Sequence, residues 1–241
     1  TPRSVLASRA TVNIEIDATN ESVRPESLIL KRGTKLTTNL SGIRYDFALL
    51  NNESANLNSA TNKYTFNNIS IAQGTLKSLL YRVDNDINNQ KFQLADSDAD
   101  TSTLRVRVQS NEESSSFDIY TPFESLRGVD STSKVYYLQE NPSGFFEVYF
   151  GDGITGFKPA NNNIITLDYV ITEGIESNGA NNFDMLDDIN GYSSITVTLA
   201  SAASGGAEEE TMESIRFNAP LTFISQNRAV TADDYAAIIK K

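Results

Sequence analysis

Hydrophobic and polar residues alternate with a period of two along several parts of the chain. Apolar Val12, Ile14 and Ile16 are separated by polar residues, and the same pattern recurs at 104–108 and 195–199. Successive side chains of a β-strand point to opposite faces, so each segment is predicted to be a strand with one buried face. Further strands are predicted at 27–31, 45–50, 134–138, 145–150 and 164–171.

One longer segment, 69–83, fits the period of a strand and that of a helix equally well. Gly74 lies in its middle and favours two strands over one helix. Turn residues stand between the predicted strands, at 32–34, 141–144 and 178–179. Antiparallel pairing is expected, because parallel strands would need helical crossovers and the first 200 residues contain no pattern for them.

The pattern changes near the C-terminus, after the Gly- and Ser-rich stretch 201–206. A helix is predicted at 207–218, because acidic residues in a first turn suit the helix dipole and several apolar residues share one helical face. Pro220 ends that helix. A second helix is predicted from Thr231, with Asp234 in a near capping box. Their position after a Gly-rich hinge makes both helices candidates for interfaces or inter-domain packing, through Met212, Ile215, Arg216, Phe217, Arg228, Asp234 and Tyr235.

These elements predict an α+β fold that is mainly antiparallel β, with two or three small β-rich domains and C-terminal helices. The polar stretch 110–116 is interpreted as a boundary between β-rich units. The predicted division is therefore a β-rich domain at 1–112, a second β-rich domain at 113–203 and a helical segment at 204–241 that leads into a truncated next domain. The chain begins without an initiator Met and ends within a helix-like pattern, so we expect it to be a piece of a longer polypeptide.

Composition removes several classes of function. The chain has 241 residues and a net charge of −11, which disfavours binding to nucleic acid or to an anionic membrane. It has no Cys and no His, so the commonest zinc ligands and the commonest general base are absent. No apolar run reaches the roughly 18 residues that a membrane-spanning helix needs. We expect no cofactor, no metal and no catalytic residue.

Three motifs carry candidate chemistry, and each has a structural alternative that is favoured. Asp96, Asp98 and Asp100 resemble the start of a calcium loop, but the Gly and Glu that would complete the loop are missing, so a solvated acidic turn is preferred. Three consecutive acids at 208–210 would point in different directions on a helix. The sequence FGDGITG at 150–156 lacks the end of a phosphate-binding loop. It predicts a structural turn formed by Gly151, Asp152, Gly153, Gly156 and Pro159.

Several motifs in a fixed order resemble the baseplate J-like family of contractile phage tails. They are VYFGDGITGFKP (148–159), SNGAN (177–181), SGGAEEETMESIRFNAP (204–220) and NRAVTADDY (227–235). Upstream, DTSTLRVRV (100–108) and VYYL (135–138) are closer still to the baseplate wedge subunits of T-even-type phages. The resemblance covers about residues 100–241, while residues 1–99 match only through ILKRGTKL (29–36). Ala207 departs from the family pattern, which often has Asp there.

The resemblance implies a late viral structural protein of the virion, assembled in the host cytoplasm. Copies of such a subunit pair with one another as homodimers and join other baseplate wedge proteins in a ring around the tail hub. No nucleic acid, membrane or cofactor is implied, and no catalytic residue belongs to this region of the family.

Two other functions stay open at this point. A carbohydrate-binding, adhesin-type module would suit an Asn-rich β protein, although its stacking platform would have to come from the 10 Tyr, because Trp is absent. A hydrolase with paired carboxylates would need two acids held about 5–10 Å apart, a condition that the sequence does not test.

Overall fold

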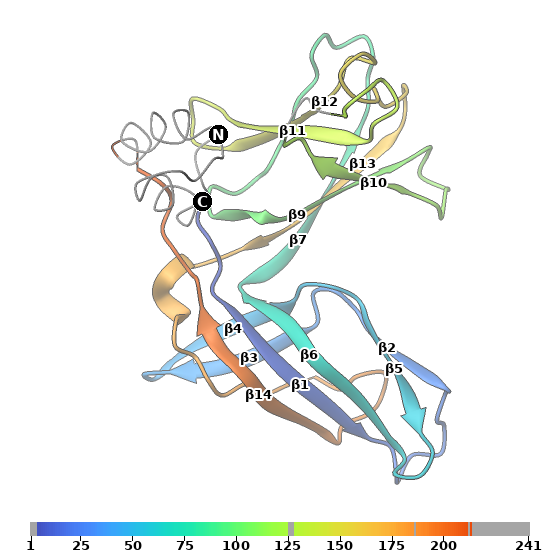
Figure 1. Cartoon of the computed structure of the whole chain (residues 1–241), viewed down its shortest axis with the longest axis vertical. Coiled ribbons are helices and arrows are strands. Elements are labelled where there is room, and N and C mark those ends of the chain that lie inside the picture. Colours follow the sequence, from blue (N-terminus) through green and yellow to red (C-terminus); the bar gives the residue numbers. More distant parts are fainter. Residues whose placement is uncertain (1–3, 125–127, 186, 212, 214–241) are drawn as a thin grey trace.

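The computed structural model describes residues 4–124, 128–185, 187–211 and 213, and Figure 1 shows that they form two β-sheets. The first sheet has seven strands, with the order β14-β1-β6-β4-β3 and with β2 and β5 paired beside β6. Its strands are β1 (Arg9–Asp17), β2 (Ser27–Leu30), β3 (Lys35–Leu40), β4 (Ile43–Leu49), β5 (Glu53–Asn58), β6 (Lys63–Gln73) and β14 (Ile195–Ser204).

The second sheet also has seven strands, in the order β7-β13-β9-β10-β11-β12-β8. Strand β13 lies between β7 and β9 and is buried at seven of its eight residues, which explains its mostly apolar sequence. The strands are β7 (Thr75–Arg82), β8 (Phe92–Gln93), β9 (Ala99–Gln109), β10 (Asp118–Pro122), β11 (Val135–Glu140), β12 (Phe146–Phe150) and β13 (Ile164–Ile171).

Alternation in the sequence predicts the buried face of β1 correctly, whereas in β14 the apolar Leu199 is 43% exposed. Val12, Ile14 and Ile16 are fully buried in β1, while the residues between them are partly exposed. Gly74 separates β6 from β7, so the prediction of two strands is confirmed. Each strand predicted from the sequence overlaps a strand of the structure, and some of the predicted ends extend one residue beyond it.

The chain leaves the first sheet at Gly74, builds the whole second sheet, and then returns. The 3-10 helix η1 (Gly174–Ser177) follows β13, and β14 then pairs antiparallel with β1. In Figure 1 the first strand, in blue, lies between β6 and the orange β14. The first sheet therefore consists of strands from both ends of the described chain.

The returning segment also joins the two outer strands of the first sheet. The amide of Ala203 in β14 donates to the carbonyl of Ala180 at 2.8 Å, and Asp184 exchanges two 2.8 Å backbone hydrogen bonds with Thr37 in β3. Phe183, between these contacts, is 3% exposed and belongs to the hydrophobic core. The segment thus closes the sheet and fills its interior.

Polar contacts join the two sheets where the chain passes between them. Asp100 of β9 is fully buried, and its carboxylate accepts hydrogen bonds from the amides of Ala7 at 3.0 Å and Ser102 at 2.9 Å. The side chain of Gln73, at the end of β6, accepts a hydrogen bond from the amide of Glu173 at 2.8 Å. Buried hydrogen-bonded groups of this kind fix one relative placement of the sheets.

The predicted α+β class is wrong for the described residues, whose only helical element is η1. The helix predicted at 207–218 does not begin as expected, because the backbone of Ala207 forms a bridge with Leu6. An extended segment with an exposed acidic face shares its composition with a helix N-terminus, which explains the error. Met212 and residues 214–241, including the predicted second helix, lie outside the described residues.

Antiparallel pairing is confirmed for every strand pair of the described sheets except β10 with β11, which run parallel. Residues 123–134 connect these two strands without any described helix. The segment 110–116 joins β9 to its antiparallel neighbour β10 within one sheet. The division at residues 112 and 203 stays a prediction, although the chain changes sheet near Gly74 and Thr172.

Candidate functional site

The loop 151–159, which we call the Gly151 loop, is organised around the side chain of Asp152. Its Oδ1 atom accepts hydrogen bonds from the amides of Ile154 at 2.9 Å and Thr155 at 3.0 Å. The amide of Gly153 donates to the carbonyl of Gly156 at 3.1 Å. These hydrogen bonds lower the pKa of the exposed Asp152 carboxyl, with the amide of Thr155 as the largest cause. An aspartate bonded in this way holds a turn.

A second aspartate holds the segment against which this loop packs. Asp130 accepts hydrogen bonds from the side chain and amide of Thr132, and these bonds lower the pKa of its carboxyl. Its carbonyl accepts the amide of Gly156 at 3.0 Å, and the carbonyl of Ser133 accepts the amide of Phe157 at 2.8 Å. Asp130 was not among the candidate residues, because the sequence gives no signal that it lies beside the Gly151 loop.

Gly151 and Gly153 should respond very differently to substitution. A Cβ at Gly151 would lie 2.4 Å from the carbonyl oxygen of Gly156, whereas Gly153 has open space and a φ of 90°. We expect Gly151→Val to lower the free energy of unfolding by more than about 2 kcal/mol through backbone displacement. Gly153→Ala should cost only about 1–2 kcal/mol of backbone strain. Urea denaturation measures both, and equal losses would contradict this account.

The two aspartates predict a dependence of stability on acid. Each folded-state pKa is lowered from its ordinary value of 3.8, so the stabilisation is complete above about pH 5 and is lost as the pH falls below 3.8 and through the lowered folded-state pKa. The variant carrying Asp130→Asn and Asp152→Asn should therefore lose less stability between neutral and acidic pH than the parent chain. Thermal melts across this range measure the difference. Asp187→Asn, at an exposed carboxyl, controls for the change in charge.

The three aspartates of the calcium-like motif do not meet. Asp96 contacts Lys77 at 2.8 Å and accepts the hydroxyl of Tyr169 at 2.6 Å, whereas Asp100 points to the junction of the sheets. The predicted solvated turn is therefore wrong for Asp100, which is fully buried. Within residues 4–124, 128–185, 187–211 and 213, no three acidic side chains are grouped as metal ligands would be. The same residues include no helix long and apolar enough to span a bilayer.

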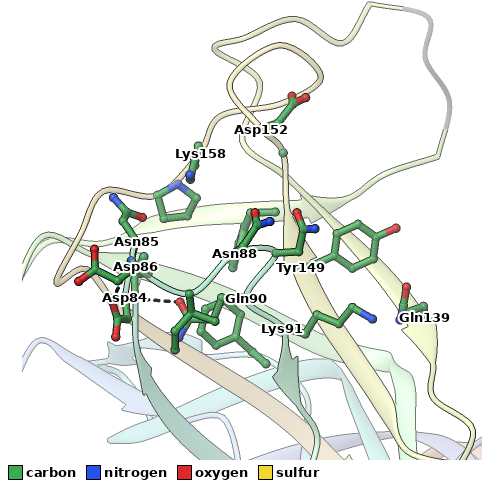
Figure 2. A pocket seen from close by; sticks show the side chains of 17 residues that line it. Asp84, Asn85, Asp86, Asn88, Gln90, Lys91, Gln139, Tyr149, Asp152 and Lys158 are labelled. Atoms are coloured by element: carbon green, nitrogen blue, oxygen red, sulfur yellow. Dashed lines mark hydrogen bonds between the residues drawn. The ribbon is translucent and has the colours of Figure 1, made fainter.

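A pocket of about 540 Å³ lies beside the Gly151 loop (Figure 2). The connection between β7 and β8 forms one side of the pocket, through polar side chains that include Asn85, Asn88 and Gln90. Tyr149 and Lys158 line the other side. Gln90 holds the connection in place, because its Oε1 accepts the amide of Asp84 at 2.9 Å. The pocket can offer amides, carboxylates and an aromatic ring to a ligand.

Aromatic rings stack next to this pocket. The rings of Tyr137 and Tyr149 lie 5.1 Å apart and nearly parallel, and Phe123 stacks on the other side of Tyr137 at 4.6 Å. All three side chains are partly exposed. Neither the pocket nor the stack was predicted, since their residues come from separate segments whose register the sequence does not reveal.

The residues predicted to serve interfaces or packing cannot be placed. Met212, Ile215, Arg216, Phe217, Arg228, Asp234 and Tyr235 all lie outside the described residues. Of the predicted turn residues, Gly151, Gly156 and Pro159 are buried, while Asp152 and Gly153 are exposed.

Two comparisons with known proteins find similarity to part of the chain. Residues 79–172 match the family model described as the third domain of bacteriophage baseplate wedge protein gp6. This region extends from within β7 to the residue after β13, and so covers almost the whole second sheet. The baseplate wedge protein gp6 of Enterobacteria phage T4 is 30% identical over an alignment of 140 residues that covers 49% of this chain.

The aligned part is only 21% of the T4 protein, so the chain corresponds to a small part of that relative. The family-model match begins at residue 79 and ends at 172, whereas the recognised motifs run from about residue 100 to the C-terminus. Both comparisons agree with the motifs, because each finds part of this chain to be similar to a bacteriophage baseplate wedge protein.

Proposed function

We propose that this chain is a structural part of a phage tail baseplate wedge, where it makes contacts between subunits. The observation that carries the proposal is the coincidence between residues 79–172, matched by the gp6 third-domain model, and the second sheet. A match that covers almost all of one structural unit supports a shared role for that unit. The likeness to a structural protein also argues against an enzymatic role.

Features of the described residues agree with a role in assembly. Large apolar side chains are exposed on both sheets, among them Ile43 at 58% and Leu80 at 68%, and Ile154 of the loop 151–159 is 74% exposed. Exposed apolar residues of this size commonly mark protein contacts when they gather on one surface. The buried polar junction at Asp100 would hold the two sheets in one arrangement while neighbours bind.

The proposed partners are a second copy of the chain and other baseplate wedge proteins, in a virion that is assembled in the host cytoplasm from late proteins. Nucleic acid and membranes are not proposed as partners, in keeping with the net charge of −11.

An electron-microscopy map of the contractile tail of the phage that encodes this chain tests the function. Density for both sheets at contacts between wedge subunits is expected. A baseplate that lacks the chain, or contains it without contacts to neighbours, would refute the proposal. Sedimentation of the isolated chain tests self-pairing separately, because a homodimer should form at micromolar concentration.

The pocket beside the Gly151 loop favours one second candidate, a carbohydrate-binding module. Tyr149 offers a ring for stacking, and Asn85, Asn88 and Gln90 offer amide groups for hydroxyls. Glycan-array binding that is lost in Tyr149→Ala would support this candidate. Binding to no glycan would remove it.

A further inference from the structure

The second sheet has one face in its hydrophobic core and one face outside it. Leu167 and Val106 point into the core, and the residues beside them in sequence therefore point the other way. We call this other side the outer face. The strand register places on it Ser78 and Leu80 of β7, Thr166 and Asp168 of β13, Arg105 and Arg107 of β9, and Ile119 of β10.

The outer face exposes large apolar side chains. Leu80 is 68% exposed and Ile119 is 53% exposed, whereas Thr166 and Asp168 of β13 on the same face are buried. Phe117, just before β10, is 47% exposed, and the Arg107 guanidinium lies 5.2 Å from its ring centroid. A single exposed apolar side chain costs the folded protein little free energy. Several together form a surface whose burial against a partner is favourable.

The same face carries more positive than negative charge. Arg107 contacts Asp168 at 2.8 Å, and Ser78 donates a hydrogen bond to the other carboxylate oxygen, so Asp168 is fully occupied. Arg105 contacts only the amide oxygen of the exposed Asn51, at 3.2 Å. No carboxylate within the described part of the chain lies at ion-pair distance from Arg105.

A third arginine reaches this face from the first sheet. Arg32 donates from Nη2 to the carbonyl of Thr103 at 2.7 Å, and its buried Nε has no hydrogen-bond partner among the described residues. Burial lowers the pKa of Arg32, the charge of Arg105 lowers it further, and the charge of Asp168 partly offsets both. Next to it, Gly33 packs closely against Leu76 of β7. Two arginines without carboxylate partners therefore lie close together, in a chain whose net charge is −11.

We propose that the outer face binds an acidic segment of a neighbouring protein subunit. Carboxylates of that segment would pair with Arg32 and Arg105, and its apolar side chains would cover Leu80 and Ile119. Guanidinium groups favour carboxylates, with which they form paired hydrogen bonds. A polyanion such as nucleic acid fits less well, because the remaining charge of the chain repels it and the apolar side chains would stay uncovered. The proposal rests on the proposed function for the origin of the partner as a neighbouring subunit.

Peptide binding to the isolated chain tests this inference. The probe is a short fluorescent peptide that alternates glutamate and leucine, compared with peptides that alternate glutamine and leucine or contain glutamate alone. We expect the glutamate–leucine peptide to bind most tightly, and its affinity to fall as salt rises. Removing both arginines, by Arg32→Gln and Arg105→Gln, should weaken binding roughly tenfold. Leu80→Ser with Ile119→Ser should weaken it by a similar factor.

Matched changes on the first sheet serve as controls. Arg44→Gln and Ile43→Ser alter an exposed arginine and an exposed isoleucine far from the outer face, and they should leave binding unchanged. Arg32→Gln can disturb the packing between the two sheets, so Arg105→Gln is also tested alone. Arg105 hydrogen-bonds to the exposed side chain of Asn51, so its replacement should leave the fold intact. Circular dichroism confirms that each variant is folded.

Three outcomes would overturn the inference. They are no preference for the glutamate–leucine peptide, equal binding by the outer-face and control variants, and full competition by inorganic phosphate without any effect of Leu80→Ser. The last outcome would indicate a simple anion site. Absence of the chain from a baseplate would refute the proposed function and leave peptide binding intact, so the two failures are distinguishable.

Discussion

Gly74→Ala is expected to lower the free energy of unfolding by more than about 4 kcal/mol, enough to unfold a domain of ordinary stability. Gly74 has a φ of 122°, which side-chain-bearing residues rarely adopt. A Cβ there would lie 2.0 Å from the carbonyl oxygen of Ile171. That oxygen belongs to β13, which pairs with β7, so the overlap cannot be relieved without separating the two strands.

Gly42→Ala provides the matched control. Gly42 has a φ of 86° but nothing within 4 Å of the added Cβ, so only backbone strain of about 1–2 kcal/mol is expected. Urea denaturation followed by circular dichroism measures both variants. A stable Gly74→Ala protein would contradict the close packing of Gly74 against the carbonyl oxygen of Ile171 in β13.

Asp100→Ala is expected to cost about 2–4 kcal/mol, because it leaves the amides of Ala7 and Ser102 without their acceptor in a buried site. The amide of Ala7 should exchange its hydrogen much faster in this variant, since it loses its acceptor in the second sheet while Ser4 stays bonded to Thr101. Denaturation and hydrogen exchange measure the two effects.

Asp98→Ala is the control for this second variant. Asp98 is exposed, and its side chain bonds only to the neighbouring Ser97, so a change within about 0.5 kcal/mol is expected. Unchanged exchange at Ala7 in Asp100→Ala would contradict the role assigned to the buried carboxylate.

The sequence predicts strands well where one face of the strand is buried in the core. β1 and β9 show clean alternation because their apolar residues pack inward and their polar residues face solvent or the sheet junction. β5, with the sequence ESANLN, was missed, because it is short and has one fully buried residue. The parallel pair β10 and β11 contradicts the expectation of antiparallel pairing, because a connection without a described helix can still bring two parallel strands together.

Only the turn of the candidate site, which is formed by neighbouring residues, could be predicted from the sequence. Turn residues at 151–153 are recognisable because Gly and Asp act on neighbouring backbone atoms. Contacts between distant segments were beyond prediction, as when Asp100 bonds to Ala7 or Arg32 reaches Thr103. Pairings of this kind depend on how two sheets are placed, and no local pattern of residues encodes that placement.

The return of the chain to the first sheet has a consequence for synthesis on the ribosome. The second sheet uses only residues between Gly74 and Thr172, so it can be completed while β14 has not yet been made. Until Ile195–Ser204 emerges, β1 has an open hydrogen-bonding edge, which is the kind of surface on which nascent chains aggregate. A chain that stops at residue 172 would keep the whole family-matched region and still expose that edge. Premature termination is therefore more hazardous for the first sheet than for the second, although the first sheet begins nearer the N-terminus.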